Sequence, residues 1–308
     1  MSSRNGLESF FRQHKEKKFL WVRPGGNHGD YLIYFGLHQL ATRLGLDYDE
    51  VDESQLAKTS LDAYDVIYLH GSGGYNDWSS GAAERILHTA LRSSSALVVQ
   101  GPFSVAENTD YVQGLFSRLG KPSAQRLIFF GREYTTYRLL LEQANRYGIE
   151  VGLNFDTALF ATKASLEQRF GKCKDDYRLY AMREDNEKST RAIHDFGFGI
   201  TLDPARYCKS FAHWVKVHAR AEQIITTRTH SAVIGAVLGK KTILYPNSYH
   251  KNRSIWEYSL RELGVLWGPD TEDPAVRTEA LQRCVPSKLR RSYKVRQAIL
   301  WAHKVPLL

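Results

Sequence analysis

Side chains suited to chemistry in this 308-residue chain lie where apolar stretches give way to small or polar residues. The clearest case is residues 224–236, where a β-branched strand pattern runs into a helix of small residues, with Arg228 and His230 at the junction. A helix N-terminus offers free N–H groups to an anion, and arginine adds a permanent charge with a forked donor set. Histidine exchanges protons near neutral pH, so this junction predicts anion binding and proton transfer. The structural alternative is a capped helix with a surface arginine and a partly buried histidine.

Two further cations follow predicted strands in the second half of the chain. Arg183 ends the strand pattern that starts at residue 177, and Lys251 lies in the loop after the pattern 242–245. Three permanent cations and a histidine at one sheet edge indicate a small, strongly anionic ligand, since each charge-assisted hydrogen bond contributes about 1.5–3 kcal/mol. Alternatively, the loops scatter these cations, and acidic residues pair with them: Glu184, Asp185 or Glu257.

The elements that must position these residues follow a strand, glycine-containing loop, helix pattern. In the first half we expect a helix over 7–13, then strands at 18–23, 65–70, 96–100, 127–130 and 148–152, and helices at 31–44, 80–92 and 134–146. In the second half we expect strands at 177–183, 199–202, 223–227, 242–245 and 265–267, and helices at 205–220, 231–238, 252–263 and 276–303. This alternation is typical of a doubly wound α/β sheet, whose ligands bind beyond the carboxyl ends of parallel strands.

The polar stretch 162–176 interrupts the alternation and indicates a domain boundary. We therefore predict an α/β fold with two Rossmann-like doubly wound domains that face a cleft, as in glycosyltransferase-B-like enzymes. The expected domains are 1–165, on the acceptor side, and 166–308, on the donor side and ending in a C-terminal helix.

Composition excludes several classes of protein. No apolar run approaches the roughly 20 residues of a membrane span, and the polar N-terminus lacks the apolar segment of a signal peptide. Cys173, Cys208 and Cys284 are scattered, without metal spacing or a disulfide framework. We expect a cytoplasmic protein without a metal or a bound cofactor.

The net charge of +9 has its densest part at the C-terminus, where the last 24 residues carry six cations and no acid. A solvated terminal helix with one packed face is the favoured interpretation. The alternative is peripheral contact with an anionic membrane at its inner face, or with a lipid-linked substrate. Nucleic acid is not an expected partner, because no nucleic-acid module is visible.

Seven short segments occur in the same order as in the polysaccharide pyruvyl transferase family, which the chain resembles along most of its length. They are Gly25-Gly26-Asn27-His28-Gly29-Asp30, Gly71-Ser72-Gly73-Gly74, Gly131-Arg132-Glu133, Asp156-Thr157-Ala158, Tyr180-Ala181-Met182-Arg183-Glu184-Asp185, Arg228-Thr229-His230 and Tyr249-His250-Lys251. Two departures stand out. The family often has Asp-Pro-Ala where this chain has Asp156-Thr157-Ala158. It often has Gly-x-Pro where this chain has Gly239-Lys240-Lys241. Neither departure removes a charged candidate residue.

The resemblance implies a two-domain fold and transfer of pyruvate from phosphoenolpyruvate, as co-substrate, onto a sugar diol of a surface glycan or exopolysaccharide precursor. The product is a ketal. The resemblance also implies that Arg183, Arg228 and His230 hold the donor, and we add Lys251 to this donor-binding set. The acceptor is expected to be a saccharide or a lipid-linked oligosaccharide.

This chemistry needs an acid to protonate the donor's methylene carbon, and we expect His230 to be that acid. Such help is typically worth about 100- to 10,000-fold. A carboxylate must orient or deprotonate the sugar hydroxyl, and the first domain supplies Asp30, Glu133 and Asp156. Asp30 is favoured because it follows a glycine loop at the head of a helix, with an ordinary helix N-cap as its structural alternative. His28 and His70 are alternative bases. The expected acceptor-binding residues are Asn27, His28, Gly73, Gly74, Glu133 and Asp156.

Two other functions fit the same patterns. A nucleotide-sugar glycosyltransferase of the same architecture is the main alternative, but its donor site needs a base-and-ribose slot, commonly with a carboxylate for the ribose. The second half of this chain offers mainly cations at its strand ends. A non-catalytic glycan-binding protein is the third hypothesis, and it would bind sugar without releasing phosphate.

Overall fold

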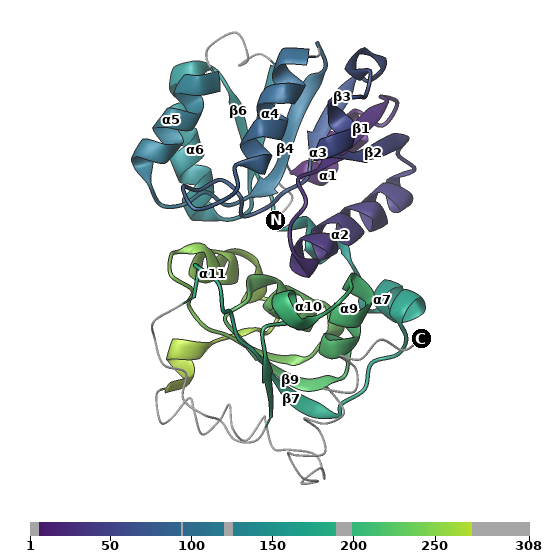
Figure 1. Ribbon diagram of the computed structural model, residues 1–308, viewed down its shortest axis with the longest axis vertical. Coiled ribbons are helices and arrows are strands. Elements are labelled where there is room, and N and C mark those ends of the chain that lie inside the picture. Colours follow the sequence, from purple (N-terminus) through teal and green to yellow (C-terminus); the bar gives the residue numbers. More distant parts are fainter. Residues whose placement is uncertain (1–5, 94, 120–125, 189–198, 273–308) are drawn as a thin grey trace. The chain divides into compact units, whose positions relative to one another are not determined.

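The chain forms two compact units in a computed structural model that describes residues 6–93, 95–119, 126–188 and 199–272 (Figure 1). The first unit comprises Met1–Gly26 and Ile33–Phe160, and the second comprises Asn27–Leu32 and Ala161–Leu308. Each unit contains a parallel β-sheet with helices, which confirms the α/β fold. The glycosyltransferase-B-like arrangement and the assignment of acceptor and donor sides stay predictions.

The sheet of the first unit has six strands in the order β2-β1-β3-β4-β5-β6, and every neighbouring pair is parallel. Its strands are β1 (Phe19–Arg23), β2 (Tyr48–Asp52), β3 (Val66–Leu69), β4 (Leu97–Phe103), β5 (Leu127–Gly131) and β6 (Glu150–Leu153). Its helices are α1 (Leu7–Gln13), α2 (His28–Leu44), α3 (Glu53–Leu56), η1 (Leu61–Ala63), α4 (Ala82–Ser93), α5 (Thr109–Leu119), α6 (Tyr134–Tyr147) and η3 (Thr157–Phe160).

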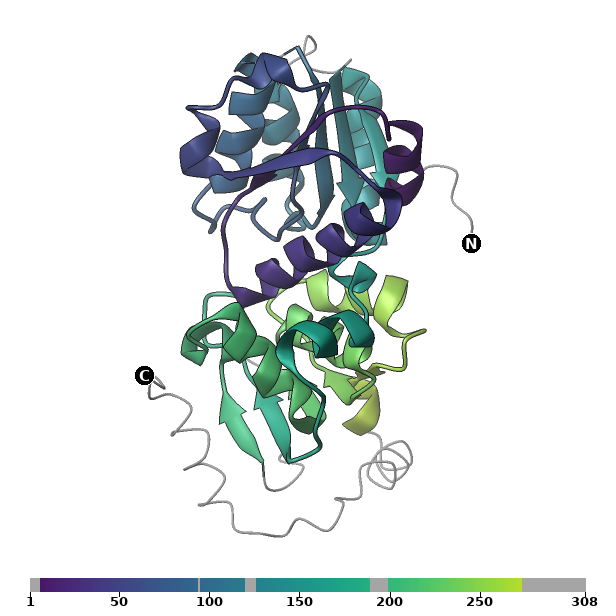
Figure 2. The same cartoon turned by 90° about the vertical axis from the view of Figure 1, so that its right-hand side faces the viewer.

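Both faces of this sheet are covered, which explains why its central strands read as continuous apolar runs. Alternate β1 residues point to opposite faces: Leu20 and Val22 join a core with α4, α5 and α6, whereas Phe19 and Trp21 join a core with α1 and α2. Figure 2 shows these two helical layers on opposite sides of the strands.

The sequence analysis missed several elements, among them the helices α3 and α5 and the edge strand β2. The residues of β2 are Tyr48-Asp49-Glu50-Val51-Asp52, and they lack the apolar run of a buried strand. Tertiary contacts override this weak local preference: β2 pairs in parallel with β1, and Tyr48 stacks on Trp21 with ring centroids 3.8 Å apart.

The sheet of the second unit has five parallel strands in the order β11-β10-β9-β7-β8. They are β7 (Tyr177–Ala181), β8 (Ile200–Leu202), β9 (Ala221–Thr226), β10 (Lys241–Leu244) and β11 (Leu266–Trp267). The helices are α7 (Lys163–Phe170), α8 (Pro204–Tyr207), α9 (Phe211–Ala219), α10 (Thr229–Leu238), α11 (Lys251–Ile255), the π-helical turn η4 (Trp256–Leu260) and η5 (Gly268–Glu272).

Two predicted helices of the second unit are wrong in detail. The expected helix 205–220 is broken into α8 and α9, because Asp203 caps α8 and Ser210 caps α9, each accepting a backbone N–H. The expected helix 252–263 starts as α11 and continues as the π-helical η4. The expected helix 276–303, its cations and Cys284 lie outside the described residues.

The two sheets share one strand order when each is numbered along its own part of the chain. Both follow 2-1-3-4-5, and the first sheet adds a sixth strand. The order reverses between β1 and β3 in the first unit and between β7 and β9 in the second. Ligands of open α/β sheets bind at such a switch point, beyond the carboxyl ends of the strands. Arg183 and Arg228 follow β7 and β9, so they flank the switch point of the second unit.

Candidate functional site

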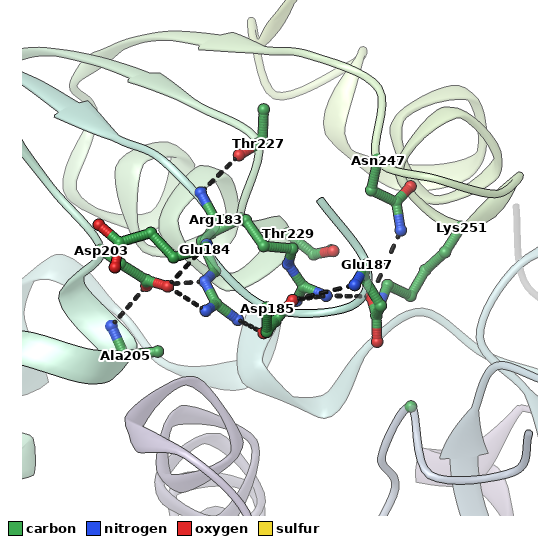
Figure 3. A network of polar contacts seen from close by, with 12 residues as sticks. Arg183, Glu184, Asp185, Glu187, Asp203, Ala205, Thr227, Thr229, Asn247 and Lys251 are labelled. Atoms are coloured by element: carbon green, nitrogen blue, oxygen red, sulfur yellow. Dashed lines mark hydrogen bonds and ion pairs between the residues drawn. The ribbon is translucent and has the colours of Figure 1, made fainter. Parts of the chain in front are cut away.

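The two arginines are held by hydrogen bonds that join the ends of β7 and β9. The hydroxyl of Thr226 donates to the carbonyl of Ala181 at 2.7 Å and accepts the backbone N–H of Arg228 at 2.8 Å. The backbone N–H of Arg183 donates to the hydroxyl of Thr227 at 2.8 Å (Figure 3). Short threonine side chains therefore place both arginine side chains at the switch point.

Arg228 is the N-cap of α10, and its guanidinium forms a bidentate pair with the carboxylate of Asp203. Nε donates to Oδ1 at 2.9 Å, Nη2 contacts Oδ2, and Nη1 lies 2.8 Å from Oδ2 of Asp185. Asp203 is buried and also accepts the backbone N–H groups of Glu184, at 3.0 Å, and Ala205, at 3.1 Å. Burial alone would lower the pKa of Arg228, but Asp203 and Asp185 raise it above its ordinary value.

Glu187 connects the other two cations. Its carboxylate contacts Nη1 of Arg183 and Nζ of Lys251, and it accepts from Nδ2 of Asn247 at 3.4 Å. Asp185 also lies 3.4 Å from Arg183. Figure 3 shows these side chains converging from separate segments of the chain. Because Arg183 and Lys251 are buried, these contacts are screened less than a surface pair.

The structure thus brings the three predicted donor-binding cations into one ion-pair network rather than scattering them. Of the three acidic partners expected in the alternative interpretation, only Asp185 takes part. Glu184 pairs with the exposed Arg206, at 3.1 Å, and Glu257 pairs with Arg253 on one helical face, at 2.6 Å.

His230 is the second residue of α10 and is half-buried. Its imidazole packs against the backbone of Gly29, in the first turn of α2: a Cβ added to Gly29 would lie 2.5 Å from Nδ1 of His230. Residues Asn27–Leu32 belong, by their contacts, with the second unit.

The residues around Gly29 form an ordinary helix cap. Asn27 accepts the backbone N–H of Gly29 through its side chain, and Asp30 accepts the backbone N–H of Asn27, both at 2.8 Å. This reciprocal pair resembles a capping box, with Asn27 at the N-cap and Asp30 as the third residue of α2. Asp30 thus contributes to the cap without being the N-cap residue, and its catalytic role stays a prediction. Nε2 of His28 lies 2.7 Å from the carbonyl oxygen of Cys208, which makes His28 a donor there.

The remaining candidate residues lie after β3, β5 and β6 in the first unit. Gly73 and Gly74 are half-buried, and Gly74 donates to the hydroxyl of Ser72 at 3.1 Å. Glu133 is fully buried and caps α6, and Asp156 is fully buried and pairs with Arg132 at 2.9 Å. These two carboxylates support loops in this structure, and their role in acceptor binding stays a prediction.

Sequence reasoning missed three residues that shape the network. Asp203 had a signal, because Asp-Pro at a helix start predicts an N-cap. Asn252 donates to the carbonyls of Thr227 and Tyr245 at 2.9 and 2.8 Å, which fixes the loop that carries Arg228. Asn252 gave no local signal, because only long-range contacts bring it to the cations. Glu187 follows Arg183 by four residues, but its contact with Lys251 depends on the fold.

Within the part of the chain that the structure describes, no group of three or more His, Cys, Asp or Glu side chains could hold a metal ion. Burial raises the pKa of the Cys208 thiol to about 12, with help from Asp203, so this thiol is no nucleophile at neutral pH. No helix among the described residues is long and apolar enough to span a bilayer.

Among the matches to known proteins are one family model and two solved structures. The family model described as polysaccharide pyruvyl transferase matches residues 27–249. A crystal structure of a functionally uncharacterized protein from Klebsiella pneumoniae has a TM-score of 0.64 and 17% identity, covering 84% of this chain and 96% of that one. The Escherichia coli heptosyltransferase WaaC with ADP-2-deoxy-2-fluoro heptose has a TM-score of 0.37 and 12% identity, covering 74% and 88%. A comparison with curated protein sequences gave no match.

Proposed function

The chain belongs to the polysaccharide pyruvyl transferase family, and on this premise we propose that it transfers pyruvate from phosphoenolpyruvate to a sugar diol. Family membership indicates pyruvyl transfer to a polysaccharide. The proposal adds the donor, the ketal product, the release of phosphate, and an acceptor that is a surface glycan or exopolysaccharide precursor, either free or lipid-linked.

One observation carries the choice of donor: Arg183, Arg228 and Lys251 meet at the switch point of the second sheet. Phosphoenolpyruvate presents a carboxylate and a phosphate close together, and arginine forks match both groups. The N-terminus of α10 adds a partial positive charge beside Arg228. A donor with two anionic groups therefore suits this cluster better than a neutral sugar does.

His230 supplies the proton that the reaction needs. It protonates the methylene carbon of the donor, which leaves an oxocarbenium-like centre at the carbon that bears the carboxylate and the phosphate. A sugar hydroxyl attacks this carbon, the C–O bond to phosphate breaks, and a second hydroxyl closes the ketal. One hydroxyl proton restores His230, and the other leaves with phosphate. General acid–base help of this kind is worth about 100- to 10,000-fold.

Asp30 is proposed to orient or deprotonate the attacking hydroxyl, and Asn27 and His28 are proposed to bind the acceptor beside it. All three lie in or next to the turn that packs on His230 through Gly29. Gly73 and Gly74 remain proposed acceptor contacts. Because Glu133 and Asp156 are fully buried, we propose that they hold the acceptor loops in shape.

The proposed location is the cytoplasm, without a metal or bound cofactor. Peripheral contact of the basic C-terminal segment with an anionic membrane remains a proposal, because that segment lies outside the described residues.

The decisive experiment measures phosphate release from phosphoenolpyruvate across a panel of glycosides with free diols. We expect release only when a suitable acceptor is present, together with a new methyl signal of the ketal in the product's NMR spectrum. Nucleotide sugars are the matched comparison in a thermal-shift assay, since a ligand that binds the folded state raises its stability. If nucleotide sugars stabilise the protein and phosphoenolpyruvate does not, the protein is a glycosyltransferase and the proposal is wrong.

A further inference from the structure

We propose that Glu187, with Asp185 beside it, is an internal competitor of the donor: the donor's anionic groups bind Arg183, Arg228 and Lys251 only after these carboxylates have turned away. This inference rests on the proposed donor site and adds a regulatory element to it. It starts from a difference among the three carboxylates of the network.

Asp203 is built into the fold as a fixed partner. It begins α8 as its N-cap, is 1% exposed, and accepts two backbone N–H groups besides its bidentate pair with Arg228. A carboxylate with this many donors cannot leave without exposing several buried polar groups. Asp203 therefore positions Arg228 whether or not a donor is bound.

Asp185 and Glu187 come instead from the short segment that follows Arg183, with a turn between them in which the backbone N–H of Glu187 donates to Asp185 at 3.1 Å. The Asp185 side chain is 46% exposed, so it can turn to water at small cost. The Glu187 side chain is 15% exposed, and its contacts to Arg183, Lys251 and Asn247 are made by side chains, which can re-form with another anion.

The net charge of the cluster favours displacement of Asp185 and Glu187 by the donor. Three cations face three carboxylates, so the cluster has no net formal charge. A strongly anionic donor gains little attraction from a neutral cluster. When Asp185 and Glu187 turn away, the three cations face Asp203 alone, and the cluster carries two net positive charges that the donor can neutralise.

The placement of the two carboxylates also fits the donor. Asp185 bridges Arg183 and Arg228, and Glu187 bridges Arg183 and Lys251. Two internal anionic groups thus span three cations, as the carboxylate and phosphate of phosphoenolpyruvate would. Without them, three neighbouring buried cations would repel one another, so the internal carboxylates stabilise the cluster until the donor replaces them.

The test measures binding of phosphoenolpyruvate and, separately, of inorganic phosphate to the full chain by calorimetry. We expect Glu187→Gln to bind both anions about tenfold more tightly than wild type. Asp185→Asn should bind them about two- to threefold more tightly, because the Asp185 side chain is half exposed. In turnover assays the gain should appear as a lower KM for phosphoenolpyruvate with little change in kcat. Glu184→Gln is the matched control, because the Glu184 carboxylate pairs with the exposed Arg206; its affinities should equal those of wild type.

Glu187→Asp, which keeps the charge on a shorter side chain, is the second variant and should gain less than Glu187→Gln. Unchanged or weaker binding of both anions to folded Glu187→Gln would overturn the inference. If phosphate binding tightens as expected while phosphoenolpyruvate binds no variant, the internal competitor stands and the proposed donor fails. If wild type binds phosphoenolpyruvate and Glu187→Gln binds it no more tightly, the proposed donor is supported and the internal competitor is overturned.

Discussion

The switch points of the two units have the same strand order but hold different polar clusters. Beside β1 and β3, the carboxylate of Glu50 accepts from Nε2 of His38 and of His70, each at 2.9 Å, with Arg23 at 3.6 Å. At β7 and β9 the cluster consists of arginines, a lysine and their carboxylates. Strand order decides where polar groups gather, whereas the side chains decide how the charge of the cluster responds to acid.

The stability of the first cluster depends on pH, because the pKa values of Glu50 and His70 are shifted in the folded protein. Burial alone would raise the pKa of Glu50, but the hydrogen bonds and charges of His38 and His70 lower it below its ordinary value. Burial lowers the pKa of His70, although Glu50 opposes this shift. In the second cluster, Asp203 and Asp185 raise the pKa of Arg228 above its ordinary value, so this arginine stays charged.

The largest expected effect is a loss of stability of the second unit at low pH. Its fully buried His218 lies 2.8 Å from the carbonyl of Trp214 and 2.9 Å from the hydroxyl of Ser231 on α10, and burial lowers its pKa to about 4. A depressed histidine pKa means that the unfolded chain takes up the proton first. Stability from His218 is therefore complete above about pH 6.5 and is lost down to pH 4, by about 3 kcal/mol in total. Urea unfolding at pH 7.5, 5.5 and 4.5 measures this loss.

The matched variant for this prediction is His218→Gln, which keeps hydrogen-bonding groups but cannot titrate. Its free energy of unfolding should change less between pH 6.5 and 4 than that of wild type. Equal slopes in the two proteins would show that the acid sensitivity of the second unit arises elsewhere.

The second prediction concerns Arg228 in the donor cluster. Arg228→Ala should lower kcat/KM for phosphoenolpyruvate by roughly 30-fold or more, because it removes about 2 kcal/mol of charge-assisted binding. Arg206→Ala is the control: Arg206 is also an arginine near this network, but its side chain is 68% exposed and pairs with Glu184. Full activity of a folded Arg228→Ala protein would remove Arg228 from the donor site.

The third prediction tests the titrating cluster of the first unit. Glu50→Gln should destabilise the protein by about 1.5 kcal/mol at pH 7, since hydrogen bonds to a charged group are lost. The folded pKa of Glu50 is depressed, so its contribution is present above its unfolded pKa and is lost as pH falls through the folded value. The difference between wild type and variant should therefore shrink at low pH, and thermal unfolding at pH 7 and pH 3 measures it. A difference that stays constant with pH would mean that packing, and not charge, accounts for the effect.

The smallest expected effect concerns the first turn of α2, which belongs to the second unit. Gly29→Ala adds a Cβ 2.5 Å from Nδ1 and 2.7 Å from Cβ of His230, so the imidazole must shift. We expect kcat to fall by about tenfold through misplacement of the acid. The control is Gly114→Ala on α5, where a Cβ meets the far end of the Arg118 side chain at 3.0 Å. Wild-type kcat in Gly29→Ala would argue against His230 as the acid.

The sequence by itself determined the α/β class and most strands, because buried parallel strands are continuous apolar runs and glycines mark where they end. It also determined the family, through motifs kept in order, and it identified Arg183, Arg228 and Lys251 as cations after strand ends. These features are local: each depends on a few consecutive residues and their preferred backbone conformation.

Tertiary structure alone decided what depends on residues far apart in the chain. Strand β2 exists because β1 pairs with it, and the turn at Asn27–Leu32 joins the second unit through its contacts. Whether Arg183, Arg228 and Lys251 would meet, and that Asp203 would pair with Arg228, depended on the order of strands in the sheet. Electrostatic pairing acts through space, so local spacing can place Asp185 and Glu187 near Arg183 but does not record their contacts with Arg228 and Lys251.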